Sequence, residues 1–434
     1  MAATTEAPQG SVELIRVDPI SYLTILNAFG QPMANPETPE FLVAEAELIR
    51  GEARRQKSER TKNLGEPIQL SGKPLAVQVH GGCAWVAENT TVARKLELET
   101  GNTLQIYRGH TGPVTSIAFC DKDFAAHNGG ILITGSWDKT IKLWDTDTKA
   151  LISSTEAHSD FVKCLSVIPS LQLLVSGSSD KIVRFWDLSD AMAGQALTSI
   201  GSISSHTRPI SCVDGVALTD TSAVLYTADS MGVIKVWDLV KESGATPRWR
   251  STLKSELMHH RTGITEMRFG SGQLWTASSD DTAQILDTTL PTPKPPVSIA
   301  HPAAVRCILP LSVTDLAEPY LITGAGDVIR VYDVSSLQEP DLINEVDAHW
   351  HDVTGLHLWI RKTVGADSKT RVEPWVVSTS LDGTIRKWRL ADLLAQSPPA
   401  RVEPPKVTKA APPAKTEFKM TEEEERELAE LLDD

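Results

Sequence analysis

The chain has 434 residues, of which 41% are hydrophobic and 23% charged, and its formal net charge is −14 at pH 7. This acidic balance argues against general affinity for nucleic acid, which needs a basic footprint. No apolar run is long enough to span a bilayer, and the first ten residues lack the regions of a secretory signal. We therefore expect an intracellular protein, cytoplasmic, nuclear or both, with no membrane partner.

Residues 1–65 are predicted to form an N-terminal extension. Thr38-Pro39-Glu40 combines a capping residue, a proline suited to the first helical turn and an acid, which predicts a helix over residues 39–61. Residues 50–62 hold six Lys or Arg against two Glu, a local net charge of +4. This segment is either a solvated helix end or a docking site for an acidic partner or RNA. Charge runs are usually solvated surfaces, which favours the first interpretation.

A series of short apolar segments comes next. Residues 66–70 predict a lone strand, and four further strands are predicted at 74–79, 83–88, 92–99 and 104–107.

Six copies of a strand–turn–strand pattern then follow. The first, Ile131–Asp145 (ILITGSWDKTIKLWD), has an apolar strand, a Trp-Asp-Lys turn and a second strand that ends in Trp-Asp. An isolated hairpin is marginal in water, so each copy needs neighbours. The copies are spaced about 42 to 56 residues apart, and a period near this length indicates a β-propeller. The other five copies span residues 174–187, 225–238, 274–287, 321–333 and 376–389.

A histidine upstream of each copy sets a second frame. An apolar residue follows each histidine after four residues, and another follows after seven. The six histidines are His110, His158, His206, His260, His301 and His349.

Gly109-His110 together with Trp144-Asp145 resembles the signature of the WD-repeat family. The resemblance covers residues 66–393. It implies an all-β fold, a seven-bladed β-propeller of four-stranded antiparallel blades. The flanking segments are expected to add an N-terminal helical extension and a flexible C-terminal tail. For function the resemblance is nearly silent, because propellers host many unrelated roles.

The blade count follows from adding the early strands to the repeats. Residues 74–107 make a degenerate first blade, and the six repeats make blades two to seven. The lone strand at 66–70 is then expected to be the outermost strand of the last blade. This closure joins the two ends of the propeller in one sheet.

The family resemblance also implies a hydrogen-bonded chain in each full repeat, from the histidine to a strand Ser or Thr, to the turn Asp and to the Trp. In blade two the strand residue is Thr134 or Ser136. Such a network would satisfy buried polar groups, so we expect scaffold histidines and no catalytic bases. The residues assigned to it are His110, Asp138, Trp144, His158, Asp180, Trp186, His206, Trp237, Asp280, Asp382 and Trp388.

Three repeats depart from the pattern. Met231 replaces the turn Asp in blade four, and Leu286 and Tyr332 replace Trp in blades five and six. We expect those blades to be held more by apolar packing.

The sequence offers no catalytic or metal-binding motif. Cys164, Cys212 and Cys307 each fall six residues after a repeat histidine, which favours buried free thiols over a disulfide or a metal site. A phosphate-binding glycine loop, GxSxG and HExxH are all absent from the sequence. We expect no enzyme activity, no metal and no cofactor.

Three insertions lengthen the repeats, at residues 121–130, 241–257 and 361–371. Loops of this length often carry binding, and the second contains Arg248-Trp249-Arg250.

The end of the chain is predicted to be a proline- and alanine-rich linker (394–419) followed by an acidic amphipathic helix (420–434). The helix has a net charge of −7 and a stripe of Leu428, Leu431 and Leu432. The stripe favours docking on a basic or grooved partner surface. A solubilising tail, or a helix folded on residues 50–62, are the alternatives.

The leading functional hypothesis is a non-catalytic scaffold or adaptor subunit that binds one or more proteins. Its candidate contacts lie after the histidines or in the hairpin turns, and aromatic and Arg side chains are common interface anchors. Partial burial against the next blade explains each of them equally well. One alternative is a ribonucleoprotein or ribosome-assembly factor, in which the basic helix and Arg248-Trp249-Arg250 would contact RNA; the charge does not favour it. Another alternative is a ubiquitin-ligase substrate receptor. The candidate contacts are Trp137, Phe161, Arg208, Arg261, Trp350 and His351.

Overall fold

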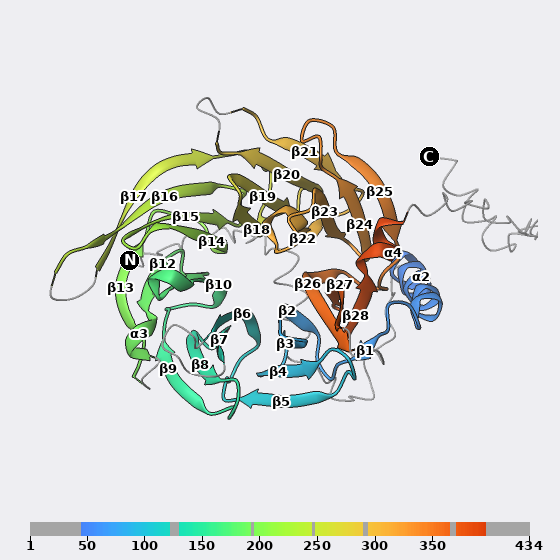
Figure 1. Cartoon of the computed structure of the whole chain (residues 1–434), viewed down its shortest axis with the longest axis horizontal. Coiled ribbons are helices and arrows are strands. Elements are labelled where there is room, and N and C mark those ends of the chain that lie inside the picture. Colours follow the sequence, from blue (N-terminus) through green and yellow to red (C-terminus); the bar gives the residue numbers. More distant parts are fainter. Residues whose placement is uncertain are drawn as a thin grey trace, which may run out of the picture. The chain divides into compact units, whose positions relative to one another are not determined.

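A computed structural model of the chain describes residues 45–121, 130–191, 195–244, 248–289, 294–364 and 370–395. These residues form seven four-stranded antiparallel sheets arranged as a ring around a central opening (Figure 1). The predicted seven-bladed propeller is therefore confirmed. The acidic segment 420–434, with Leu428, Leu431 and Leu432, and nearly all of the predicted linker lie outside the described residues.

Each blade takes four strands, which run in order from the centre outward. The strands of blades one to three are β2 (Pro74–His80), β3 (Cys83–Glu88), β4 (Val92–Glu97), β5 (Thr103–Arg108), β6 (Val114–Asp121), β7 (Gly130–Ser136), β8 (Thr140–Asp145), β9 (Leu151–Glu156), β10 (Val162–Ile168), β11 (Leu173–Ser178), β12 (Val183–Asp187) and β13 (Thr198–Ile203). Those of blades four and five are β14 (Ile210–Thr219), β15 (Ser222–Asp229), β16 (Ile234–Glu242), β17 (Arg248–Leu257), β18 (Ile264–Gly270), β19 (Gln273–Ser278), β20 (Thr282–Asp287) and β21 (Val297–Ala300). Those of blades six and seven are β22 (Val305–Pro310), β23 (Tyr320–Ala325), β24 (Val328–Asp333), β25 (Asp341–Val346), β26 (Val353–Val364), β27 (Thr370–Ser380), β28 (Thr384–Arg389) and β1 (Ile68–Gln69). The described helices are α2 (Glu45–Thr61), α3 (Leu188–Ala191) and α4 (Leu390–Leu394), with short 3-10 turns at Pro169–Leu171 and Leu311–Val313.

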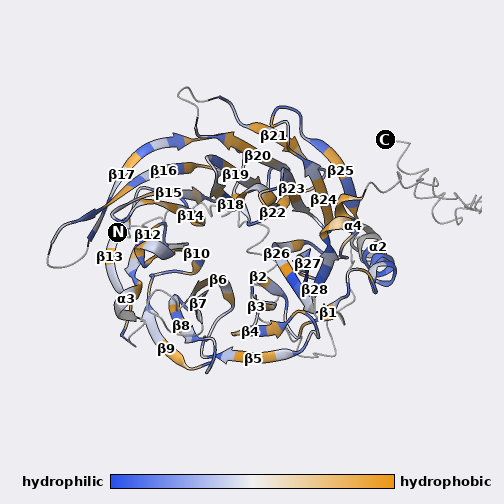
Figure 2. Ribbon diagram, in the orientation of Figure 1, coloured by the Kyte–Doolittle hydropathy of each residue, from blue (hydrophilic) through white to orange (hydrophobic). Residues whose placement is uncertain are grey.

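The hydrophobic core lies between neighbouring blades. In one cluster, Ile133 and Leu143 of blade two pack with Leu174 and Trp186 of blade three. Because blades cover both faces of each sheet, the middle strands are apolar nearly throughout, and every residue of β7 is buried. Figure 2 shows the apolar positions along the strands of the ring, in contrast to the hydrophilic α2.

The ring closes as expected, with the earliest strand completing the last blade. β1 pairs with β28, and Ile68 lies opposite Ile385. The strand is only two residues long because the chain turns sharply just before it. Gly65 (φ 67°) makes this turn, and a Cβ atom there would lie 2.7 Å from the Trp388 ring.

Helix α2 lies outside the ring beside β28 and α4 (Figure 1). Residues 39–44 of the predicted helix lie outside the described part of the chain. The buried Arg386 guanidinium donates hydrogen bonds to the carbonyl oxygens of Thr61 and Leu64, just where the helix ends. The Lys57 ammonium forms ion pairs with Asp327, at 2.7 Å, and with Asp347. The Arg60 guanidinium also pairs with Asp347, at 2.5 Å. Two cations of the basic segment are thus paired with blade six.

The insertion at 241–257 differs from the loop that the sequence predicts. Residues 248–257 form β17, which pairs with β16 along its length. Trp249 is only 5% exposed and packs against Ile168 and Ile200 of blade three. The prediction of a free Arg248-Trp249-Arg250 binding loop is therefore wrong, because the alternation of the strand turns the indole inward.

Candidate protein-interaction face

Each signature blade carries a hydrogen-bonded chain at the end where its histidine lies. In blade two, His110 Nδ1 lies 2.8 Å from Asp138 Oδ2, and His110 Nε2 lies 2.7 Å from Thr134 Oγ1. Trp144 Nε1 donates to the same Thr134 oxygen at 2.9 Å. The order is therefore Asp, His, Thr and Trp, with the histidine in the middle, and Thr134 rather than Ser136 is the strand member. All donors are satisfied when the imidazole is neutral and carries its proton on Nδ1.

Blades three and seven repeat this geometry. His158 Nδ1 lies 2.9 Å from Asp180, and Trp186 donates to Ser176 at 2.8 Å. In blade seven the corresponding residues are His349, Asp382, Ser378 and Trp388, with contacts of 2.8, 2.8 and 2.9 Å. The histidines are enclosed among protein groups, which fits a scaffold role.

Blade four corrects the expectation that its network lacks an aspartate. Met231 occupies the turn, but Asp229, two residues earlier, lies 3.2 Å from His206 Nδ1. Thr227 joins His206 (2.7 Å) to Trp237 (2.9 Å). Asp229 is at the end of a strand, a position that holds Ser in blades two and three, so the repeat frame alone does not reveal it.

Blades five and six have shortened chains. His260 contacts Asp280 at 3.1 Å and Thr276 at 2.8 Å, with no Trp in the network. In blade six, His301 makes no hydrogen bond or ion pair with a carboxylate of the described residues, and its Nδ1 donates to the Ile299 carbonyl at 3.1 Å.

Burial shifts these titratable groups. It lowers the pKa of His158, His260 and His349 below the usual 6.5, and lowers the pKa of His301 to about 4. Burial alone would raise the pKa of Asp382, but the hydrogen bond from His349, the nearby imidazole and the bonds from Thr384 outweigh it and lower the pKa. The folded protein thus favours the neutral forms of these four histidines and the ionised form of Asp382.

Acid is expected to destabilise the protein well above the range in which carboxylates titrate. The unfolded histidines have pKa values near 6.5, so below that pH the unfolded chain binds more protons than the folded one. The free energy of unfolding should fall by at least about 1.4 kcal/mol per pH unit between pH 6 and 5, the value for one extra proton. Urea unfolding at pH 7.5, 6 and 5 measures this slope. A free energy that stays constant over that range would contradict the assignment of neutral histidines.

The described cysteines are free thiols. Cys212 and Cys307 are buried, and Cys164 is half-buried. Burial raises the pKa of Cys164 to about 12. These side chains fill space between blades.

An aromatic pair lies on the face of the ring that carries the histidine loops. Trp137, in the β7–β8 turn, stacks on Phe161, in the loop before β10, with ring centroids 4.8 Å apart and planes inclined by 17°. Phe161 is 37% exposed and Trp137 is half-buried. The pair therefore bridges blades two and three while keeping one ring accessible to solvent.

The other predicted contact residues divide by exposure. Arg208 and Arg261 are exposed, and Arg261 also donates to the Asp280 carbonyl at 3.2 Å. Trp350 is half-buried, and His351 is 9% exposed with its Nδ1 accepting a hydrogen bond from the Asp352 amide. His351 thus contributes little to a contact surface.

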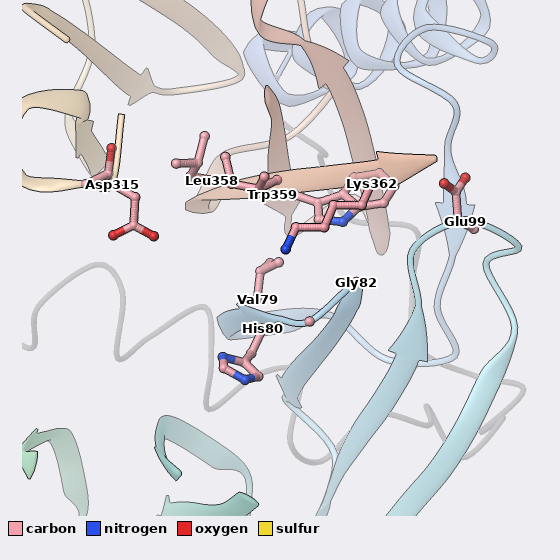
Figure 3. A pocket seen from close by; sticks show the side chains of 11 residues that line it. Val79, His80, Gly82, Glu99, Asp315, Leu358, Trp359 and Lys362 are labelled. Atoms are coloured by element: carbon pink, nitrogen blue, oxygen red, sulfur yellow. The ribbon is translucent and has the colours of Figure 1, made fainter. Parts of the chain in front are cut away.

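The structure also has a cavity of about 690 Å³, at the opposite end of the blades from the histidine loops. Figure 3 shows Asp315 and Lys362 at its wall. The Glu99 carboxylate, which also lines the cavity, accepts hydrogen bonds from Arg361 Nε at 2.6 Å and from Arg361 Nη2 at 2.9 Å. Among the residues that the structure describes, no three His, Cys, Asp or Glu side chains are grouped to hold a metal ion. In the same part of the chain, no helix is both long enough and apolar enough to cross a membrane.

Comparison with known proteins places the repeats in a family. The model of the family described as WD domain, G-beta repeat matches residues 101–145 and 149–187. An uncharacterized WD repeat-containing protein of Schizosaccharomyces pombe is 28% identical over 91% of this chain and 99% of its own length. The COMPASS component SWD3 of Saccharomyces cerevisiae is 26% identical over 51% of this chain and 72% of its own. Pre-mRNA-processing factor 19 of Oryza sativa is 23% identical over 75% of this chain and 57% of its own. Residues 101–145 and 149–187 thus match WD repeats, and the seven blades with their histidine networks make the chain similar to WD repeat-containing β-propeller proteins.

Proposed function

We propose that this protein is a non-catalytic scaffold subunit that holds partner proteins on the face bearing its histidine loops. Propellers of this family typically act as interaction scaffolds, and two of the relatives carry names of complex or processing components. The observation that carries the proposal is the Trp137–Phe161 stack. Its exposed ring lies outside the described interblade core clusters, and aromatic side chains are enriched among interface anchors.

The contacts of the basic segments favour protein over RNA as the partner. Lys57 and Arg60 are already paired with acidic side chains of blade six, and Trp249 is buried. The basic segment 50–62 and the Arg248-Trp249-Arg250 segment, which suggested an RNA site, thus both make contacts within the propeller.

The test is affinity purification with mass spectrometry of the full chain and of Phe161→Ser. We expect Phe161→Ser to lose a defined set of partners, because it removes the exposed ring. The matched control is Leu253→Ser, which changes a residue of similar exposure (45%) on the outer strand of blade four. Loss of the same proteins with both variants, or with neither, would contradict the proposal.

The acidic segment 420–434 is proposed as a second docking element. A chain that ends at Lys415 should lose partners that contact Leu428, Leu431 and Leu432, and retain those lost with Phe161→Ser.

We propose a location in the cytoplasm, the nucleus or both. Fluorescence microscopy of a tagged full chain checks the location.

A further inference from the structure

Two lysines beside the aromatic stack have a backbone conformation that lysine rarely adopts. Lys139 (φ 70°) and Lys181 (φ 69°) follow the turn aspartates of blades two and three. Blades four and seven have glycine at the corresponding position, Gly232 and Gly383, also with positive φ. A left-handed residue with a Cβ atom costs folding free energy that glycine avoids. Blade five has Asp281 (φ 66°) at this position, so the turn imposes a positive φ on its residue, and blades two and three place a cation there.

Both lysines lie next to the stack. Lys139 is two residues from Trp137 in the same turn. The backbone amide of Ser179, two residues from Lys181, donates to the carbonyl oxygen of Phe161 at 3.0 Å. The two lysines are therefore within two residues of the aromatic pair or of its hydrogen-bond partner, in turns of adjacent blades.

The charged groups around the stack leave these cations available. Lys139, Lys181 and Arg208 are exposed and make no ion pair with any residue in the described ranges. The turn carboxylates beneath them are engaged: Asp138 contacts His110 at 2.8 Å, and Asp180 contacts His158 at 2.9 Å. Asp160, the residue before Phe161, accepts a hydrogen bond from the Phe161 amide at 2.8 Å. A ligand approaching this face from solvent thus meets two exposed lysines and an exposed arginine near an exposed Phe ring. Carboxylates beside an apolar side chain complement this arrangement.

We propose that the Lys139–Lys181 site, formed by these two lysines with Trp137 and Phe161, binds an acidic segment of a partner protein that carries leucine-like side chains between its carboxylates. The apolar side chain packs on Phe161, and the carboxylates pair with the lysines and with Arg208. This assignment rests on the proposed scaffold function and specifies the chemistry of its ligand.

The probe for the test is a fluorescein-labelled peptide with the sequence of residues 420–434, which combines glutamates with leucines. A second peptide has every glutamate replaced by glutamine. Fluorescence anisotropy measures their affinities for the chain ending at Lys415, which keeps all the described strands. We expect the glutamate peptide to bind, more weakly as NaCl is raised, and the glutamine peptide to bind at least about tenfold more weakly. Equal binding of the two peptides overturns the proposal. So does the absence of binding at about 100 µM protein, a concentration between the micromolar and millimolar Kd range.

The variant Lys139→Gly/Lys181→Gly separates recognition from structure. It should weaken the glutamate peptide roughly fivefold to tenfold, while the Tm stays the same or rises because glycine relieves the left-handed turns. The matched control is Lys149→Gly. Lys149 is also exposed and left-handed (φ 58°), but it lies in the β8–β9 turn at the other end of blade two. The control should bind normally. An unchanged affinity in the double variant, or an equal loss in the control, overturns the site.

The last measurement compares peptide binding by the full chain and by the chain ending at Lys415. If it binds the peptide as tightly as the chain ending at Lys415, the site is open to a partner, which supports the proposal. Markedly weaker binding by the full chain would make residues 420–434 the occupant and overturn the assignment to a partner. Loss of captured proteins with Phe161→Ser but not with Lys139→Gly/Lys181→Gly would leave the scaffold function standing and refute only the acidic ligand.

Discussion

A chain that begins at Ser71 is expected to melt roughly 10 °C or more below the full chain, or to fail to fold. The deletion removes β1, so Ile385 and Thr384 lose their strand partners and blade seven loses its outermost strand. It also removes Ile68 and Leu70, which are buried between blades seven and one. Burial of two such side chains contributes about 1.5 to 3 kcal/mol each.

A second loss from this deletion is at Arg386. This residue is 2% exposed, and its guanidinium donates to the carbonyl oxygens of Thr61 and Leu64. The deletion removes both acceptors, and a hydrogen bond from a charged group contributes about 1.5 to 3 kcal/mol. The total approaches or exceeds the whole stability of many domains, about 5 to 15 kcal/mol.

Differential scanning calorimetry checks this prediction. The matched control is a chain that begins at Glu45, which keeps every contact that the structure describes and should melt within about 2 °C of the full chain. Equal melting of the Ser71 chain and the full chain would refute the closure of the ring by β1.

Asp382→Ala is expected to lower the free energy of unfolding by about 3 to 5 kcal/mol. The carboxylate accepts from His349 Nδ1 at 2.8 Å, from the Thr384 amide at 2.9 Å and from the Thr384 hydroxyl at 2.6 Å. All three residues are buried. Alanine leaves the Thr384 amide and hydroxyl without this acceptor, and leaves His349 Nδ1 only its longer contact of 3.3 Å with Thr384 Oγ1. An unsatisfied buried polar group costs about 1 to 3 kcal/mol.

Urea unfolding at pH 7.5 measures the effect of Asp382→Ala. Asp341→Ala is the control, because Asp341 is exposed at the start of the outer strand of blade six and makes no side-chain contact with the described residues. The control should change the free energy by less than about 0.5 kcal/mol. A loss below about 1 kcal/mol for Asp382→Ala, on the order of one ordinary hydrogen bond, would show that the network is not a principal support of blade seven.

The local pattern of the sequence was sufficient to predict the propeller. Each repeat alternates short apolar strands with polar turns, and such hairpins are stable only when neighbours cover their faces. The recurring histidine frame then fixed the number of signature blades, and the strand at 66–70 was correctly assigned to the last blade. These features depend on residues close together in the chain or on a regular period.

The errors arose where the period and the structure diverge. Asp229 supplies the blade-four carboxylate from a position that holds Ser in blades two and three, whereas the turn position of the repeat holds Met231. Trp249 was assigned to a loop because an insertion breaks the repeat, whereas β17 continues the pairing and buries the indole against blade three.

The sequence by itself determined the fold class and the blade count, because these follow from the spacing within and between repeats, whereas the expected histidine networks came from the resemblance to the WD-repeat family. Only the tertiary structure decided which side chains meet across blades. Arg386 binds a carbonyl 325 residues away, and Trp137 stacks on Phe161 of the next blade. It also placed Lys139 and Lys181 in left-handed turns around that stack. Such contacts depend on the ring geometry that brings distant segments together, and neither hydrophobic periodicity nor local propensity encodes them.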